Sequence, residues 1–150
     1  MSLMERDSGK TRINGSFVLS YLYRCDDPSN PYRGRSALLR WVERDLERWC
    51  AQSQHSARSV FETGLVMRMV GTALPRSCAD RVRSALNQAV PALVSLEPSG
   101  LGAAALDQVA QLTGGAGARQ GSQRTRDRWL DRQSDEGWFP TESGIDLATQ

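Results

Sequence analysis

The chain has 150 residues, of which 39% are apolar and 24% are charged, and its formal net charge is +2. This length suffices for one domain with its own core, and the composition excludes a disordered or collagen-like chain. No stretch approaches the roughly 20 consecutive apolar residues that cross a bilayer, so we predict no membrane span. Residues 1–7 include acidic side chains and lack the apolar core of a secretory signal, which favours a cytoplasmic protein.

The three cysteines, Cys25, Cys50 and Cys78, are an odd number and include no Cys-x-x-Cys pair. This spacing argues against a disulfide framework and against a zinc knuckle. We therefore interpret the cysteines as small buried hydrophobic residues, and we predict neither a metal nor a cofactor.

Lys10 is the only lysine, and arginine supplies the remaining positive charge. The arginines of residues 40–48 alternate with acids, a pattern typical of a solvated helix face with ion pairs between neighbouring turns. A surface that binds nucleic acid is more lopsided in charge, so we do not expect nucleic acid as a partner.

Residues 1–16 are predicted to be a flexible N-terminal segment, followed by one helical domain over 17–150. The apolar and aromatic run 17–24 follows Ser16, which suits the N-cap position, and precedes a turn rich in Asp and Pro at 26–31. These signals predict a short first helix.

Apolar residues then recur at three- and four-residue steps from Ser36 to about Gln52, which predicts a helix with one buried stripe. A third helix is predicted over 59–73, ended by Pro75. Gly64 lies within it and indicates a close contact with another helix.

The fourth helix is predicted to begin near Ser77 or Asp80 and to run to about Val94, with Pro91 kinking or splitting it. A fifth helix is predicted over 103–113.

A sixth helix is predicted over 124–133, after a connector, 114–121, that is rich in Gly and Ala and is expected to be flexible. No segment shows the alternating apolar pattern of a strand. The chain is therefore predicted to be all-α and built of antiparallel helical hairpins.

A motif closes the last predicted helix. Trp129 and Leu130 lie on that helix, Gln133 follows at its end, and Gly137 and Trp138 stand in the next turn. This order resembles the QW repeat of squalene-type cyclases, in which the glutamine holds backbone groups at helix ends and the tryptophan covers the next helix. The resemblance implies a structural clamp and gives these residues no catalytic role.

Further phrases extend the resemblance, namely residues 21–23 with 30–34, then 61–65, and finally 135–140. They are similar to bacterial proteins of the terpenoid cyclase and protein prenyltransferase superfamily. The resemblance implies an α/α toroid, in which helix pairs stack around a central cavity. Such toroids have more helices than are predicted here, so we expect part of a toroid, a fragment of a longer chain. One apolar helix face is then left uncovered and favours self-association.

The resemblance implies the scaffold rather than its chemistry. The Asp-x-Asp-Asp acid of the cyclases has no counterpart, and no Asp and Cys accompany the single histidine, His55, in a zinc-binding pattern. Catalytic residues are therefore unknown. Asp135, Glu136 and Trp138 are the predicted rim of a ligand cavity, because a rigid scaffold usually presents function on a loop held at a helix end. The expected ligand is an extended or apolar small molecule, or a polymer.

Three alternatives remain open. A toroidal polysaccharide lyase needs a Tyr/His pair for proton transfer, and Tyr21, Tyr23, Tyr32 and His55 are available. Residues 105–114 look like the start of a DNA-binding helix-turn-helix, but the predicted connector lies where the recognition helix has to begin. The third alternative is a non-catalytic helical interaction module. His55 itself lies in a polar turn, where an exposed or helix-capping role is expected.

Overall fold

The computed structural model describes residues 20, 21, 23, 35–133 and 137. Within this part of the chain there are five complete helices and no strand, so the predicted all-α class is confirmed. Ser20, Tyr21 and Tyr23 are helical and belong to the first predicted helix; the predicted flexible segment lies outside the described residues. The complete helices are α2 (Arg35–Cys50), α3 (Ala57–Val70), α4 (Arg76–Ser95), α5 (Gly100–Thr113) and α6 (Ala116–Leu130).

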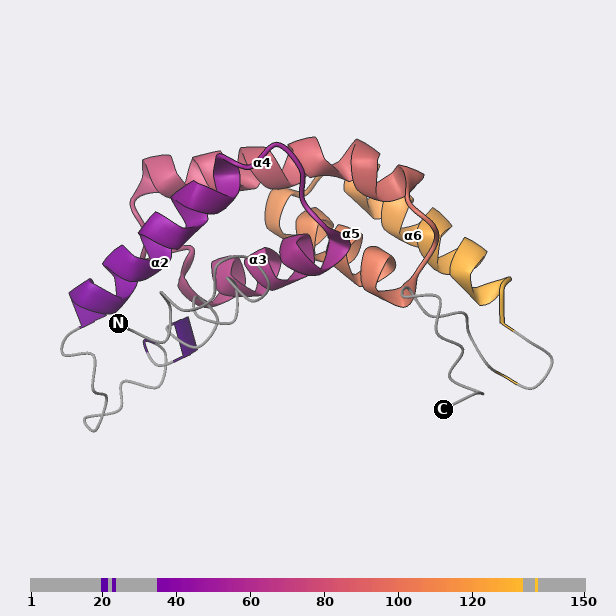
Figure 1. Ribbon diagram of the computed structural model, residues 1–150, viewed down its shortest axis with the longest axis horizontal. Helices are drawn as coiled ribbons and strands as arrows, with labels where there is room; N and C mark the ends of the chain where they lie inside the picture. Colours follow the sequence, from indigo (N-terminus) through magenta and orange to yellow (C-terminus); the bar gives the residue numbers. More distant parts are fainter. Residues whose placement is uncertain (1–19, 22, 24–34, 134–136, 138–150) are drawn as a thin grey trace.

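Successive helices alternate between two layers. Figure 1 shows α2, α4 and α6 along the outer curve of an arch, with α3 and α5 inside it. Each helix also packs against its second neighbour in the chain, because α2 contacts α4, α3 contacts α5 and α4 contacts α6. The two layers are joined by the contacts of α5 with α4 and α6, and of α3 with α4.

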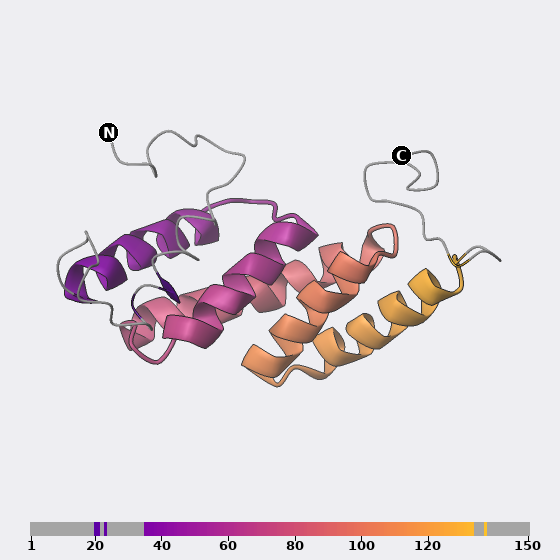
Figure 2. The ribbon, with the colours of Figure 1, turned by 90° about the horizontal axis from the view of Figure 1, so that it is seen from below.

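Helices within a layer run in the same direction. Figure 2 shows α3 and α5 side by side and parallel, while the outer helices run the opposite way. The contacts between α2 and α4 also show that these two helices are parallel. Arg81 of α4 pairs with Glu47 of α2. One turn earlier on each helix, Cys78 interacts with Glu43. Each short turn therefore reverses the chain, as in an array of helical hairpins.

The core lies between the layers. Side chains that are almost fully buried come from four helices, namely Leu38 and Val42 of α2, Val60, Val66 and Val70 of α3, Val82 and Leu86 of α4, and Leu106 and Val109 of α5. Helix α5 is buried around much of its circumference, whereas α6 buries one narrow face. The stripe predicted for α2 is confirmed, since its apolar residues at three- and four-residue steps form this core.

Side-chain caps and a glycine set three of the helix boundaries. Ser56 and Ser99 accept hydrogen bonds from the backbone N–H groups of Ser59 and Gly102, which have no partner within the first turn of their helices. Gly114 ends α5 with φ +66°, a left-handed conformation that costs glycine little.

The prediction of a flexible connector over 114–121 is wrong. Helix α6 begins at Ala116, with only two residues between it and the end of α5, and includes most of the predicted connector. Its buried residues are all small, namely Ala118, Gly121, Ser122 and Thr125. A face of this kind carries no large apolar side chains, so the periodicity that reveals an amphipathic helix is missing.

Pro91 was predicted to kink or split the fourth helix, and it does not split it, because α4 continues through it to Ser95. Proline removes the N–H that would bond to the carbonyl of Asn87, four residues earlier. Both Pro91 and Asn87 are exposed, so water reaches the carbonyl that loses its partner. Helix α3 ends at Val70, earlier than predicted, with Gly71 as its cap.

Candidate functional site

The predicted cavity rim, Asp135, Glu136 and Trp138, lies outside the described residues. Close to it, the Gln133 side chain donates a hydrogen bond from Nε2 to the Gly137 carbonyl oxygen, at 3.0 Å, on an exposed turn. Gly137 has φ +89°, where other residues are strained. The Gln133 side chain thus bonds to the backbone of a glycine four residues later in the chain.

The ends of α4, α5 and α6 meet beside this turn. The indole of Trp129 packs against Gly100, where an added Cβ would lie 3.2 Å from the ring. An ion pair joins Arg132 to Glu97, with 2.5 Å between nitrogen and oxygen. Leu130 is not buried here, since 47% of it is exposed.

The uncovered apolar face expected of a partial toroid is absent from α6. Its outward side carries arginine, glutamine and aspartate. Among the described residues, the exposed large hydrophobic side chains are Tyr21, Leu96 and Leu130. Leu96 adjoins Glu97 in the chain and Leu130 ends α6, so the two leucines belong to the same end of the molecule.

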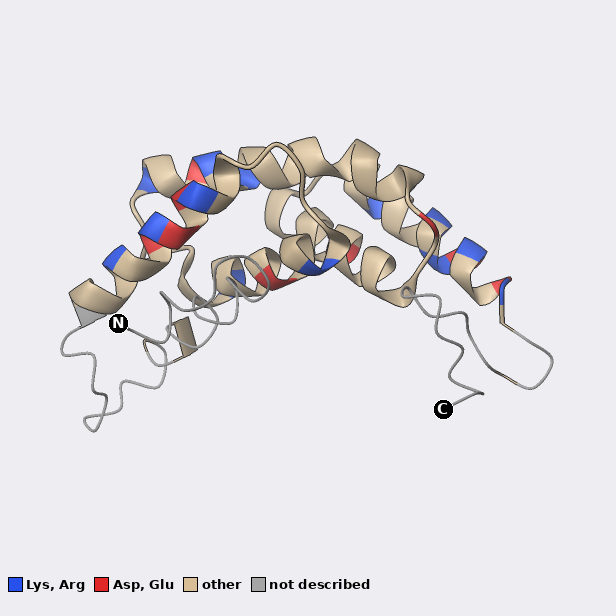
Figure 3. Cartoon of the chain, viewed as in Figure 1, with Lys and Arg blue, Asp and Glu red and all other residues tan. Residues whose placement is uncertain are grey.

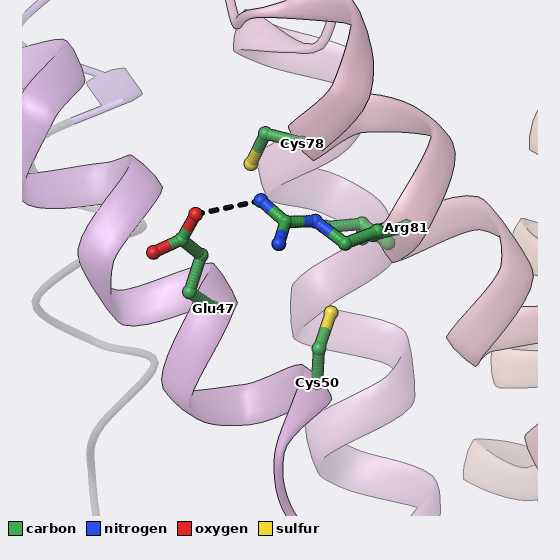
Figure 4. A pocket seen from close by; sticks show the side chains of 5 residues that line it. Glu47, Cys50, Cys78 and Arg81 are labelled. Atoms are coloured by element: carbon green, nitrogen blue, oxygen red, sulfur yellow. Dashed lines mark hydrogen bonds and ion pairs between the residues drawn. The ribbon is translucent and has the colours of Figure 1, made fainter.

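A pocket opens between α2 and α4, which are neighbours in the outer layer (Figure 4). Glu47, Cys50, Cys78, Arg81 and Val82 line it, and its volume is about 50 Å³. This space holds one or two water molecules and is far smaller than the few hundred Å³ typical of small-molecule sites. Sequence patterns do not indicate this group of residues, because α2 and α4 are separated in the chain by α3.

An ion pair lies between the two thiols of the pocket. Figure 4 shows the Glu47 carboxylate and the Arg81 guanidinium with Cys78 on one side of them and Cys50 on the other. The pair is 2.7 Å apart and both side chains are well exposed, so it stabilises the fold by about 1 kcal/mol at most. Both cysteines are free thiols.

Burial keeps these thiols protonated. It raises the pKa of Cys78 to about 11, with Glu43 and Glu47 adding to the effect and Arg81 opposing it. The pKa of Cys50 is also raised, mainly by burial, while Arg81 again acts in the opposite direction. Because the thiolate is the nucleophile and the metal ligand, neither cysteine is activated for catalysis or metal binding.

The prediction that cysteines are buried hydrophobic residues is confirmed for Cys78, which is 1% exposed. Cys50 is half-buried, and Cys25 lies outside the described residues. Among the described side chains, no group of three or more His, Cys, Asp or Glu residues is arranged to hold a metal ion.

His55 stacks on Trp49, with 3.9 Å between the ring centroids and 22° between the ring planes. The indole N–H of Trp49 in turn donates to the Ser59 hydroxyl at 3.1 Å. The Nδ1 atom of His55 is buried without a hydrogen-bond partner, and burial lowers the pKa of the imidazole. The predicted exposed or capping role is therefore wrong, since His55 packs in the turn and Ser56 provides the cap.

The inner layer offers a second surface, formed by α3 and α5. Leu65 and Leu101 are half-buried and stand outside the core cluster and its packed neighbours. Between the two helices, the Arg68 guanidinium donates to the Oε1 of the buried Gln108 at 3.5 Å. A Cβ at Gly64 would lie 2.9 Å from the Gln108 Cβ, so the close helix contact predicted at Gly64 is confirmed.

The turn between α5 and α6 joins an antiparallel hairpin. Contacts run from the turn, where Gly115 N–H donates to the Thr113 hydroxyl, to the far end, where Trp129 meets Gly100. Halfway along, the Ser122 hydroxyl donates to the Ala103 carbonyl oxygen at 2.9 Å. A helix-turn-helix crosses at about 90–120°, so its helices touch mainly near the turn. The second helix does begin early enough for that motif, but the hairpin geometry differs from it.

Models of protein families, curated proteins and solved structures were compared with the chain, and none matched. Within its described part, the molecule is therefore defined by its own geometry as a curved two-layer array of helical hairpins. It has a mixed polar and apolar inner face, and burial shifts the pKa values of Cys50, Cys78 and His55 toward their neutral forms.

Proposed function

We propose that the chain is a helical-hairpin module of an α/α-toroid-like protein, in which α3 and α5 form part of the wall of a ligand cavity. The observation that carries the proposal is the alternation of helices between an outer and an inner layer, with one direction in each layer. The inner helices, α3 and α5, lie on the concave side of the arch (Figure 1), which corresponds to the cavity side of a toroid. The proposal thus agrees with the resemblance to the terpenoid cyclase and prenyltransferase superfamily.

The chemistry of the inner face supports an extended or apolar ligand. Leu65 of α3 and Leu101 of α5 keep part of their apolar surface outside the core. A ligand that covers such surface gains about 25 cal/mol for each Å² removed from water. Arg68 and Gln108 place a guanidinium and a carboxamide between the two helices, where they can orient a polar group of the ligand.

The proposal covers binding and leaves any reaction aside. Fold alone does not specify chemistry, and the activity of a toroid depends on the groups that line its cavity. The neutral thiols of the α2–α4 pocket and the stacked imidazole of His55 lie away from α5, at the α2 side of the array. They are accounted for by packing.

Calorimetric titration with farnesol, an extended apolar alcohol, tests the proposal. The double variant Leu65→Glu and Leu101→Glu places two charges on the inner face, so we expect at least a tenfold loss of affinity. Leu96→Glu is the matched control, because it makes the same substitution at an exposed leucine of the outer layer. The proposal fails if the wild-type chain binds no farnesol, or if the control loses as much affinity as the double variant.

A non-catalytic interaction module is the second candidate. It is favoured by two exposed leucines, Leu96 and Leu130, which are neighbours in the chain, at one and two residues' distance, of the ion-paired Glu97 and Arg132. Sedimentation velocity at rising concentration tests it, with Leu130→Gln as the variant. Self-association that disappears in Leu130→Gln supports the module, whereas a monomer at all concentrations contradicts pairing through these leucines.

A further inference from the structure

Helix α6 carries four exposed arginines, Arg119, Arg124, Arg126 and Arg128, against a single aspartate, Asp127. The four ion pairs between described side chains use none of these arginines. Asp127 instead accepts a hydrogen bond from the Gln123 amide at 3.2 Å. The positive charge of this helix is thus not neutralised by its own acid or by the neighbouring helices.

The arginines lie on both flanks of the exposed face. At 3.6 residues per turn, Arg124 and Arg128 are one turn apart on the flank next to Gly121, which packs against Val94 of α4. Arg119 and Arg126 are two turns apart on the opposite flank, beyond Ser122, which bonds to α5. Figure 3 shows the positive positions along the whole length of α6.

The centre of the exposed face, between the two flanks, is polar and carries hydrogen-bonding groups. It consists of Gln120, Gln123 and Asp127, all exposed. Helix α6 packs against α5 and α4 through its narrow buried face alone, and it lies at the end of the array (Figure 2). Among the described residues, none packs against the half of its surface that faces away from the array, so this half can face a large partner.

We propose that α6 binds double-stranded DNA by lying in its major groove. That groove is about 12 Å wide and admits one α-helix with phosphates along both walls. Arginines on both flanks can then contact the phosphates of both walls. Gln120 and Gln123 face the base edges, with which side-chain amides form hydrogen bonds both as donors and as acceptors. This surface is separate from the inner face to which we assign the ligand.

The shape of the charged surface distinguishes a duplex from an anionic membrane. A flat membrane touches one side of a helix, so it can meet either the Arg124 flank or the Arg126 flank, or else the polar centre with Asp127. A groove surrounds the helix and engages both flanks at once. The expectation against nucleic acid rested on the charges of residues 40–48 in α2, whereas this surface combines Arg119 of the predicted connector with Arg124, Arg126 and Arg128 of the predicted sixth helix.

Fluorescence anisotropy with a labelled DNA duplex, repeated over a series of salt concentrations, tests the proposal. If four phosphates are contacted, the logarithm of the binding constant falls with the logarithm of salt concentration with a slope of about −3.6. Arg124→Gln with Arg126→Gln removes one charge from each flank, so we expect roughly tenfold weaker binding and a slope nearer −1.8.

Arg58→Gln with Arg83→Gln is the matched control, because it removes the same charge from two arginines that are ion-paired elsewhere. We expect it to bind as the wild type does. Absence of binding by the wild-type chain at low salt overturns the proposal. So does an equal loss in the control, because binding then follows net charge rather than α6.

Variants of single flanks complete the test. Arg119→Gln with Arg126→Gln and Arg124→Gln with Arg128→Gln are each expected to weaken duplex binding, since both groove walls are used. Loss with only one of the two pairs contradicts binding in a groove. Vesicles of phosphatidylserine and phosphatidylcholine provide the other comparison, and a chain that binds these vesicles but no duplex overturns the proposal. Circular dichroism establishes that each variant keeps its helices. The dependence of wild-type binding on salt concentration tests the proposal even if a variant fails to fold.

Discussion

The contacts that α6 makes with α4 and α5 differ from the α2–α4 contact in how they hold helices together. On α6, small residues let the neighbouring helices approach so closely that a Cβ at Gly121 would lie 2.7 Å from a methyl group of Val94 on α4. In the α2–α4 contact, the core side chains are larger, such as Val42 and Leu86, and a pocket of about 50 Å³ remains. One contact has no room for another atom, whereas the other has unfilled space.

This difference shows how each contact responds to a change in side-chain volume. Close contact between small residues gains dispersion energy. It also allows a hydrogen bond from a side chain to the backbone of a neighbouring helix, as from Ser122 of α6 to Ala103 of α5. It also makes added volume costly, because close-packed interiors transmit strain. The larger side chains of the α2–α4 contact leave unfilled space, so this contact is expected to tolerate a small increase in side-chain volume.

Gly121→Ala is expected to have the largest effect, a loss of about 1–3 kcal/mol in the free energy of unfolding, because the new methyl group overlaps Val94. Gly117→Ala is its control in the same helix, since nothing lies within 4 Å of a Cβ there. The control is expected to gain up to about 1 kcal/mol from helix propensity. Urea unfolding measures both, and a stabilised Gly121→Ala protein contradicts the close contact.

Ser122→Ala is expected to cost about 1 kcal/mol, since it removes the hydrogen bond to the Ala103 carbonyl and adds no volume. Ser84→Ala, at an exposed position of α4, supplies the control for the change in helix propensity. Chemical denaturation again gives the difference. Equal stabilities of the two variants show that the hairpin is held by packing alone.

Cys78→Val adds volume beside the pocket of the α2–α4 contact, so we expect a change of less than about 1 kcal/mol, toward greater stability. Cys78→Ala enlarges the same pocket and is expected to destabilise the protein. Thermal unfolding measures the pair of variants. A loss for Cys78→Val as large as that for Gly121→Ala removes the distinction between the two contacts.

The smallest effect concerns His55, which belongs to the turn that follows α2. Burial lowers the pKa of its imidazole, so the unfolded chain takes up a proton first as the pH falls. The contribution of His55 is fully present above its ordinary pKa of about 6.5 and is lost as the pH falls through the lower pKa of the folded state. His55→Phe keeps a ring against Trp49 without titrating.

Urea midpoints from about pH 7.5 down to about pH 5.5 check this prediction. The wild type is expected to lose more stability over this range than His55→Phe, in which only the carboxylates titrate. Identical slopes contradict a buried, neutral imidazole.

The sequence predicted those helices whose buried faces carry large apolar side chains. The stripe of α2 is an example, because Leu38, Val42 and Leu46 recur at three- and four-residue steps and are all buried. The first half of α6 was missed for the opposite reason, since Ala118, Gly121 and Ser122 bury a face with almost no apolar area. Small residues allow two helices to pack closely, but they leave no periodic pattern of apolar residues in the sequence.

The candidate sites could be predicted only where the signal was local. The close approach at Gly64 was visible in the sequence, but its partner, Gln108, was not, because α3 and α5 are separated in the chain by α4. The same is true of Cys50 and Cys78, which line one pocket only because α2 and α4 are neighbours in the outer layer. Contacts between a helix and its second neighbour in the chain can be predicted only when the two layers are known.

The alternation of helices between two layers is measured most directly by nuclear Overhauser effects in the labelled protein. The account predicts one between the α protons of Gly64 and the β protons of Gln108, which joins α3 to α5. It predicts another between the α protons of Gly121 and a methyl group of Val94, which joins α6 to α4. A spectrum in which only consecutive helices show such contacts contradicts the two-layer array.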